Sequence, residues 1–458
     1  MMRRQQRRFR VHALLNRMGA NAIYVIAAGF ASIILIGSIL LSLPCATRSG
    51  ESIGWFDALF TSTSAVCVTG LIVRDTATTF NLFGQVVLLC LIQLGGLGFM
   101  TFATMLLRLI GRQASLQERM LIRESLNEEG VGGMESLIRW VATSAFTVEL
   151  VGAVLFAFRF IPKYGPWKGA FYSIFHAVSA FCNAGFDVLG EGVSIARYGK
   201  DPLVLLTLSF LIIAGGLGFG AVYDLIRARG LKRARLHTRV VFVATGALLL
   251  FGTVSVLMGE WNNAGTLGKL SWGEKLLAAF FQSVTFRTAG FAALNQRLLR
   301  PATKFLGTVL MLIGAAPAST GGGLKVTTVG LLLAAAVSIA RGRDQTRISG
   351  RSVPMETLRR ALSIVVIGLG VFVLDVAVIA LIHPDAPLSD ILYECASAVG
   401  TVGLSSWGTD RFHPAARMML ILSMYMGRIG PLSLTLAIAH RQQNEDRILL
   451  PEEKIAVG

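Results

Sequence analysis

Charged residues are scarce in this sequence, and long apolar runs take up much of its length. Asp, Glu, Lys and Arg make up 15% of the 458 residues, whereas a soluble domain carries about 25%. Residues 22–44, 203–223 and 417–439 each exceed the roughly 18 residues of an apolar run that predicts a membrane helix. The composition therefore excludes an ordinary soluble domain and predicts a membrane protein with several spans.

The groups that define several other classes of protein are also missing. The five cysteines, an odd number, include no pair with metal-ligand spacing, which argues against a zinc site and against a disulfide framework. The sequence has no His-Glu-x-x-His motif, and its six histidines are scattered. The run Gly95-Gly96-Leu97-Gly98 lies in an apolar segment, so it is not a dinucleotide motif, and no phosphate-binding loop occurs. These absences argue against an enzyme, against a covalent cofactor and against nucleotide binding by this chain.

The positive charge of the chain, a net +17, is concentrated in a few stretches. Lysines and arginines cluster in residues 3–17, 108–139, 227–239 and 341–360, between the apolar runs. If the chain crosses the membrane and returns between successive clusters, all of these clusters lie on one side of the membrane. The positive-inside rule makes that side the cytoplasm. We therefore expect cytoplasmic termini, at residues 1–21 and 441–458, and no nucleic-acid partner. The arginine-rich start has no small-residue cleavage site, so we interpret it as a tail and not as a signal peptide.

Four glycines recur at nearly even intervals along the chain. They are Gly70, Gly185, Gly290 and Gly403, and the steps between them are 115, 105 and 113 residues. Similar apolar segments surround each glycine, so the chain divides into four repeated units. We number these units 1 to 4, and they cover residues 22–111, 137–227, 236–341 and 358–440.

Each unit is predicted to contain a membrane helix, a half-length helix, an extended segment with the glycine, and a returning membrane helix. The half-length helices are expected at residues 55–65, 167–181, 273–285 and 388–399. The first covers about 11 residues, which is too short to cross a bilayer. Eight full spans and four re-entrant segments give all units the same orientation, unlike inverted repeats. Non-helical backbone at membrane depth must be buried or line water, so we predict an all-α, potassium-channel-like fold around a central pore.

The extended segments have the features of an ion-selective filter. Backbone carbonyls can replace the water shell of a permeating ion, and such segments often need a positive φ, which glycine adopts without steric cost. The string Thr401-Val402-Gly403 matches the start of the potassium-channel filter, although Leu404 replaces the tyrosine that follows there. Acidic side chains are missing from these segments, which favours a monovalent cation, K+, at the filter carbonyls. The predicted filter residues are Val66, Cys67, Val68, Thr69, Gly70, Cys182, Asn183, Ala184, Gly185, Arg287, Thr288, Ala289, Gly290, Gly400, Thr401, Val402 and Gly403.

Three charged residues lie close to these segments. Arg287 lies three residues before Gly290, and we expect it to point away from the pore axis and to bond carbonyls of the half-length helix. Asp187 follows Gly185, and Glu394 lies inside the fourth half-length helix. Each of these two carboxylates could attract cations at a pore mouth or cap the local structure, and the sequence favours neither role.

Glycine-rich patterns also recur in the returning helices. In units 1 and 2 they are Gly95-Gly96-Leu97-Gly98-Phe99 and Gly215-Gly216-Leu217-Gly218-Phe219, which we interpret as close helix packing. In unit 3, Pro317 and three glycines predict a break in the helix. The broken segment is expected below the filter as a movable gate, and the alternative is a static break that shapes the cavity. The predicted gate residues are Gly314, Ala315, Ala316, Pro317, Ala318, Ser319, Thr320, Gly321, Gly322, Gly323, Lys325 and Arg428.

Arg428 lies near the middle of the last apolar run. A charge at that depth is costly and usually functional. We predict that it projects beneath the filter and forms an electrostatic barrier to cations. The alternative is a structural pair with Glu149 or Asp375, the other charges within predicted spans.

These features together resemble the Trk/Ktr/HKT superfamily of potassium transporters. The resemblance covers nearly the whole chain and rests on the four single-glycine segments, the broken run 314–325 and the motif Gly427-Arg428-Ile429-Gly430-Pro431. Within the superfamily, the sequence is most similar to the KtrB-type membrane subunits of bacterial Ktr uptake systems. The first unit starts after about 21 residues, so we expect the additional N-terminal helix pair of Trk-type relatives to be absent.

The resemblance implies a homodimer with one pore per protomer in the bacterial inner membrane. It also implies a cytosolic ring of KtrA-like RCK-domain subunits, which binds ATP or ADP, so that nucleotide is bound by the partner only. Potassium uptake in this superfamily can be sodium-dependent. By resemblance, the four glycines are filter positions, residues 314–325 form an intramembrane gating loop, and Arg428 is the arginine on the gate side.

Other functions remain as alternatives. Within transport, these are a general monovalent cation channel and a Trk-like protein with a different regulator. A membrane enzyme is disfavoured by the missing catalytic motifs. A structural or receptor-like membrane protein would not need four segments of broken backbone.

Overall fold

The computed structural model describes residues 24–98, 134–190, 194–343 and 345–430. The predicted cytoplasmic tails, 1–21 and 441–458, lie outside the described residues, as do the ends of the first and last predicted spans. Most of the described residues are helical, and one short hairpin, β1 (Arg347–Ile348) and β2 (Arg351–Ser352), occurs among them. Short helices occur at η1 (Pro44–Ala46), α3 (Thr76–Thr79), η2 (Ala196–Tyr198), η3 (Gln296–Leu298) and η4 (Thr409–Arg411).

Four helices in the described part of the chain are long and apolar enough to cross a membrane by themselves. They are Tyr24–Ser42, α7 (Met134–Tyr164), α11 (Leu236–Glu260) and α15 (Met355–Ile382). Large apolar side chains on these helices are exposed, for example Leu150, Leu250 and Leu381. A wide exposed apolar surface is stable only against another apolar phase. The long helices therefore have the surface of membrane helices in contact with lipid or with other membrane helices.

A shorter, more buried helix follows each long helix. These half-length helices are α2 (Trp55–Val66), α8 (Pro166–Phe181), α12 (Trp272–Thr285) and α16 (Leu388–Val399), and each agrees with its predicted range to within one residue. Local sequence explains their starts. Gly54 and Gly165 turn the chain with positive φ before α2 and α8, Ser271 and Glu274 form a capping box at α12, and Pro387 precedes α16.

The returning helices are α4 (Leu82–Leu97), α9 (Pro202–Gly216) with α10 (Phe219–Ala228), α13 (Pro301–Leu312) with α14 (Val326–Ala340), and α17 (Pro414–Ile429). The predicted break in unit 3 is present between α13 and α14. The prediction of an unbroken span in unit 2 is wrong, because α9 and α10 meet at an angle of 92°. Eight uninterrupted spans are therefore not what the structure shows.

Equivalent glycines explain where three of these helices stop. Helices α4 and α17 end before Gly98 and Gly430, and α9 ends just before Gly218. All three glycines have positive φ, at +81°, +97° and +85°. With ψ values near +130°, these residues lie outside the helical region and end the helix, and glycine tolerates such a positive φ best. The repeated glycine motif thus encodes a helix end as well as packing.

The first glycines of the same motifs lie directly against the half-length helices. A Cβ atom on Gly95, Gly215 or Gly427 would overlap the carbonyl oxygen of Val66, Phe181 or Val399, respectively. Each of these carbonyls belongs to the last residue of a half-length helix. The predicted packing role of these glycines in units 1 and 2 is therefore confirmed, and it extends to unit 4.

Gly215→Ala is expected to destabilise the protein by about 1–3 kcal/mol, because its Cβ would overlap Phe181 and also meet Thr320 Oγ1 at 2.7 Å. Gly246→Ala on α11 is the matched control, since no atom lies within 4 Å of its Cβ position and alanine is the better helix former. Thermal unfolding of the purified protein in detergent measures the difference. Equal midpoints for the two variants would contradict tight packing at Gly215.

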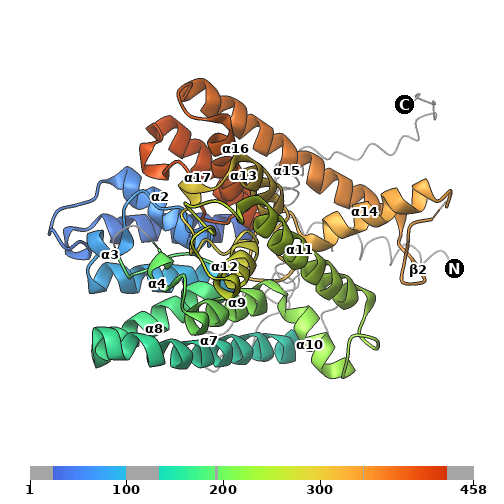
Figure 1. The fold of residues 1–458 in the computed structure, drawn as a ribbon, viewed down its shortest axis with the longest axis horizontal. Helices are drawn as coiled ribbons and strands as arrows, with labels where there is room; N and C mark the ends of the chain where they lie inside the picture. The colour runs from blue at the N-terminus through green and yellow to red at the C-terminus, as the bar shows by residue number, and fades with distance from the viewer. Residues whose placement is uncertain (1–23, 99–133, 191–193, 344, 431–458) are drawn as a thin grey trace, which may run out of the picture.

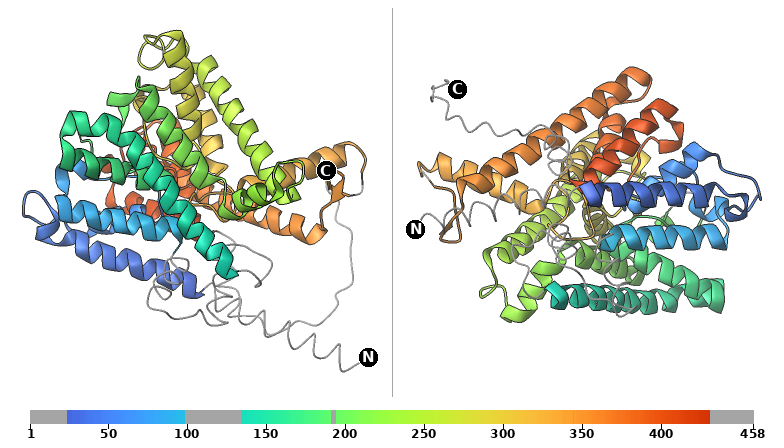
Figure 2. Two further views of the ribbon diagram at one scale, coloured as in Figure 1. Left: turned by 90° about the horizontal axis from the view of Figure 1, so that it is seen from below. Right: turned by 180° about the vertical axis from the view of Figure 1, so that it is seen from behind.

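Contacts between the helices close into a ring. Helix α4 packs against α8, α9 against α12, α13 against α16, and α17 returns to pack against α2. Each returning helix therefore contacts the half-length helix of the next unit, and the last unit contacts the first. The early, blue part of the chain and the late, red part lie next to each other, which closes the ring (Figures 1 and 2). The glycine segments follow the half-length helices into this centre.

Candidate ion-binding ring and gate

The four glycine segments adopt one backbone conformation. Gly70, Gly185, Gly290 and Gly403 have φ values of +93°, +69°, +78° and +96°. Two residues earlier stand Val68, Asn183, Thr288 and Thr401, whose φ values are +49°, +60°, +66° and +49°. Only eight described residues other than glycine have positive φ, and four of them occupy this position. Such residues are uncommon and are held in place by their surroundings, so the repeated conformation is a property of the site.

The four segments also touch one another in a closed cycle. A Cβ atom on Gly70 would lie 2.5 Å from the oxygen of Ala184, one on Gly185 would lie 2.8 Å from that of Ala289, and one on Gly290 would lie 2.7 Å from that of Val402. The cycle closes because a Cβ atom on Gly403 would overlap the oxygen of Thr69. Each carbonyl belongs to the residue just before the next glycine. Four carbonyl oxygens therefore meet in a ring, and only glycine leaves room for them.

The electrostatic surroundings of the ring favour a cation. Each glycine segment begins directly after the C-terminal end of a half-length helix, where the caps are Cys67, Cys182, Phe286 and Gly400. The C-terminal end of a helix carries a partial negative charge. Carbonyl oxygens and four helix ends thus surround the same point without a carboxylate in the segments. Rings of this kind bind monovalent cations in place of their water shell.

The two nearby carboxylates accept hydrogen bonds from the protein itself. Asp187 accepts one from the backbone N–H of Leu189 at 3.2 Å. Glu394 is fully buried and accepts one from the hydroxyl of Thr409. Asp390, one turn earlier in the same helix, forms a buried ion pair with Lys304 of α13, whose Nζ lies 2.6 Å away. These contacts favour the structural role for Asp187 and Glu394 over attraction of cations at a mouth.

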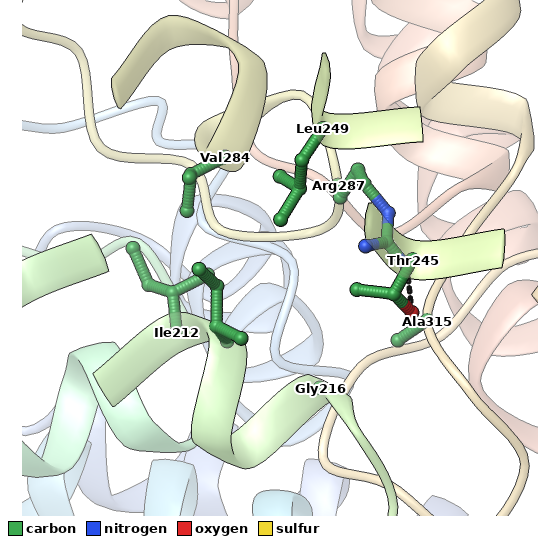
Figure 3. Close-up of a pocket in the computed structure, with 8 residues that line it drawn as sticks. Ile212, Gly216, Thr245, Leu249, Val284, Arg287 and Ala315 are labelled. Atoms are coloured by element: carbon green, nitrogen blue, oxygen red, sulfur yellow. Dashed lines mark hydrogen bonds between the residues drawn. The ribbon is translucent and has the colours of Figure 1, made fainter. Parts of the chain in front are cut away.

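Arg287 differs in part from expectation. Its side chain lines a small pocket of about 10 Å³ together with residues of α9, α11 and α12 and with Ala315 (Figure 3). Its hydrogen-bond partner is the hydroxyl of Thr245 on α11, at 3.5 Å, and the predicted bonds to carbonyls of the half-length helix are not formed. The helix carbonyls are already used by its own backbone, whereas Thr245 is turned toward the pocket (Figure 3).

The broken segment of unit 3 lies against the inner residues of the ring. A Cβ atom on Gly321 would overlap Thr288 Oγ1, and one on Gly322 would overlap Thr401 Oγ1. Backbone hydrogen bonds hold the segment to unit 2. The N–H groups of Ala316 and Thr320 in the segment donate to the carbonyls of Gly216 and Gly215 in unit 2, at 3.0 and 3.1 Å. Residues 314–325, which we call the intramembrane loop, therefore cover the two threonines that adjoin the ring.

The unit 2 break, which the sequence did not predict, receives this loop. The backbone N–H of Phe219, the first residue of α10, donates to Ala318 at 3.0 Å. This N–H is free to do so because the start of a helix leaves its first donors without partners in the helix. The signal that could have revealed the break is Gly218 itself, because the same spacing of glycines occurs before the ends of α4 and α17.

Arg428 fixes the loop to unit 1. Its guanidinium donates to the carbonyl of Thr320 in the loop. It also donates to the carbonyls of Gly95 and Gly96 in unit 1, at 2.5 and 3.1 Å. Lys325 Nζ donates to the carbonyl of Gly321 at 2.8 Å. Two cationic side chains thus hold the covering loop by its carbonyl groups.

The alternative pairing of Arg428 with a carboxylate is not formed. Glu149 accepts hydrogen bonds from Gln93 at 3.0 and 3.3 Å, and Asp375 accepts one from Ser423 at 2.5 Å. Both carboxylates are satisfied by neutral side chains. Arg428 therefore lies among the carbonyls of the loop and of unit 1, and not beside a carboxylate.

Comparison with known proteins agrees with this architecture. Residues 15–447 match the family model TrkH, described as a cation transport protein. The chain is 40% identical to Ktr system potassium uptake protein B of Bacillus subtilis, across 95% of this chain and 96% of that one. It is 37% identical to potassium/sodium uptake protein NtpJ of Enterococcus hirae, across 96% and 98%.

A solved structure shares the fold. The potassium transporter TrkH from Vibrio parahaemolyticus has a TM-score of 0.70 against 91% of this chain and 84% of its own, at 18% identity. At this identity the likeness speaks for the fold only. The relatives are transport proteins and not enzymes, and they are membrane proteins, in agreement with the apolar helices described above. The chain thus belongs to the TrkH family of cation transport proteins, within the Trk/Ktr/HKT superfamily, and is KtrB-like.

Proposed function

We propose that this chain is the potassium-translocating subunit of a Ktr-type uptake system. The observation that carries the proposal is the closed ring of Thr69, Ala184, Ala289 and Val402 carbonyls between the four glycines. In this proposal the four units surround a central pore in the same orientation, and K+ passes through the ring in exchange for its water shell. The names of the relatives support the choice of ion, since one is a potassium uptake protein and another a potassium/sodium uptake protein.

The intramembrane loop and Arg428 are proposed as the gate. The loop covers Thr288 and Thr401 on one side of the ring, and Arg428 holds it there. A cation beneath the ring would meet both a covering backbone and a positive charge. Movement of the loop away from the two threonines would open the path, and its glycines give it the backbone freedom to move.

The surroundings of the subunit are proposed from the resemblance. We place it in the inner membrane of a bacterium with both termini in the cytoplasm, as a homodimer with one pore in each protomer. A cytosolic ring of KtrA-like RCK-domain subunits, which binds ATP or ADP, would control the gate. Sodium would act as a coupling or regulatory ion. The word "system" in the name of the Bacillus subtilis relative supports a partner subunit.

Growth of a bacterial host that lacks its own potassium uptake systems tests the proposed function. Expression of the chain together with a Ktr-type regulatory subunit is expected to restore growth at potassium concentrations that do not support the empty host. The matched control is a chain with Gly403→Asp, which adds a side chain where the oxygen of Thr69 already lies. Growth that is restored by neither chain, although both reach the membrane, would overturn potassium uptake as the function.

A further inference from the structure

Each half-length helix carries a hydroxyl side chain in its last turn, directly behind the ring. These residues are Ser64, Ser179, Thr285 and Ser397, and none is accessible to solvent. Their backbone carbonyls accept the N–H of the residue just before each ring glycine, at 2.8, 2.8, 3.2 and 2.7 Å. In unit 3 this backbone hydrogen bond joins residues four apart in the sequence, whereas in the other units the two residues are five apart. Thr285 therefore has the position that a serine has in the other units. The four residues are therefore structurally equivalent.

Their side chains divide into two pairs. In units 1 and 4, Ser64 Oγ accepts the N–H of Gly70 at 3.0 Å, and Ser397 Oγ accepts the N–H of Gly403 at 2.9 Å. In units 2 and 3 the hydroxyls donate instead. Ser179 bonds the carbonyl of Phe186 and Thr285 bonds that of Phe291, both at 2.7 Å. The first pair thus holds the ring glycine itself, and the second pair holds the residue after it.

This difference matters because of peptide geometry. In a trans peptide the C=O of one residue and the N–H of the next point in opposite directions within one plane. The N–H of Gly70 shares its peptide plane with the C=O of Thr69, and Thr69 supplies a ring oxygen. A serine that fixes the glycine N–H therefore also aims the ring carbonyl. The same holds for Ser397, Gly403 and Val402.

We propose that Ser64 and Ser397 are positioning residues that aim two of the four ring carbonyls and so set the preference for K+ over smaller cations. Ser179 and Thr285 anchor the strand one residue beyond the ring and influence this preference less. The inference rests on the proposed function of the ring. Glycine at these positions has little intrinsic resistance to rotation, so the orientation of the carbonyl depends on the hydrogen bond behind it.

Two other buried hydroxyls in the half-length helices provide matched controls. Thr63 in α2 donates to Leu59 and Ser173 in α8 donates to Gly169, so both bond only their own helix. Both are almost as buried as the positioning residues, at 1% exposure against 0%. Their removal costs a similar hydrogen bond but leaves the ring peptides untouched.

The test is uptake of potassium into liposomes or potassium-depleted cells, with sodium as competitor. We expect Ser64→Ala and Ser397→Ala each to lower the preference for K+ over Na+ by about tenfold, because a buried N–H loses its acceptor and the ring peptide can rotate. Ser179→Ala and Thr285→Val are expected to lower it by at most about threefold. Thr63→Val and Ser173→Ala should leave it unchanged. Ser64→Thr, which keeps the hydroxyl, should restore most of the preference.

The outcomes separate this inference from the proposed function. A wild-type chain that transports no potassium would overturn the function itself. A selective wild-type chain whose Ser64→Ala and Ser397→Ala variants keep full preference would overturn only the positioning role. Equal losses in the controls Thr63→Val and Ser173→Ala would also overturn it, since the effect would then follow from general destabilisation. Because Ser64 and Ser397 lie in different units, a variant that fails to reach the membrane leaves the other to decide.

Discussion

Replacing Gly290 by serine is expected to lower the preference of uptake for K+ over Na+ by at least about tenfold, which corresponds to about 1.4 kcal/mol. The added Cβ would lie 2.7 Å from the carbonyl oxygen of Val402, which belongs to the ring. Serine at a φ of +78° also carries a steric cost of about 1–2 kcal/mol. Both effects displace a ring carbonyl, and the coordination shell then fits K+ less well. Uptake of K+ or rubidium at several sodium concentrations measures the change.

Gly54→Ser controls for the backbone cost in this experiment. Gly54 has a comparable φ of +86°, but no atom lies within 4 Å of its Cβ position. It precedes α2, at the opposite end of this half-length helix from the ring segment. The variant is expected to keep the K+ preference of the wild type. If Gly290→Ser also kept it, the glycines would serve packing only, and the ring could not be the selective element.

Arg428→Gln is expected to raise the rate of potassium uptake by about tenfold, provided that opening of the loop limits the rate. The guanidinium makes three hydrogen bonds to carbonyls, one of which belongs to the loop. Hydrogen bonds that involve a charged group contribute about 1.5–3 kcal/mol each, so losing the bond to Thr320 is enough to shift the balance toward an open loop. Initial uptake rates, normalised to the amount of protein in the membrane, test this expectation.

Arg428→Lys separates the charge from the attachment of the loop. Lysine keeps the positive charge but lacks the planar group with several donors that reaches unit 1 and the loop together. If the hydrogen bonds hold the gate, Arg428→Lys should be fast like Arg428→Gln. If the charge alone blocks cations, only Arg428→Gln should be fast. Rates at or below that of the wild type for both variants would contradict a gating role for Arg428.

Local features of the sequence predict much of this fold. The half-length helices lie within one residue of their predicted ranges because glycine, proline and a capping box mark their starts. The four ring glycines stand out by their even spacing, and the structure gives all four a positive φ between +69° and +96°. Pro317 and the glycines around it predict the break in unit 3, since proline cannot continue a regular helix. In each case a single residue type restricts the backbone directly.

Contacts between distant residues could not be predicted in the same way. The break at Gly218 looks like packing in the sequence, because its role depends on the loop of unit 3 that docks there. Arg287 was expected to bond its own helix, but Thr245 from the preceding helix is its partner. The partners of Arg428 are backbone carbonyls from two other units. Every residue has a backbone carbonyl, so the residue types in the sequence do not indicate which carbonyls bind the arginine. Long-range pairing of this kind follows from the closed ring of helices.

The position of a bound ion tests the central claim most directly. Crystals of the purified protein in thallium or rubidium salts would show, by anomalous scattering, where a potassium-like ion binds. We predict a peak between the carbonyl oxygens of Thr69, Ala184, Ala289 and Val402, which persists when sodium is added in excess as a competitor. A protein that transports potassium but shows its strongest peak elsewhere, with none at the ring, would contradict the assignment of these carbonyls as the selective site.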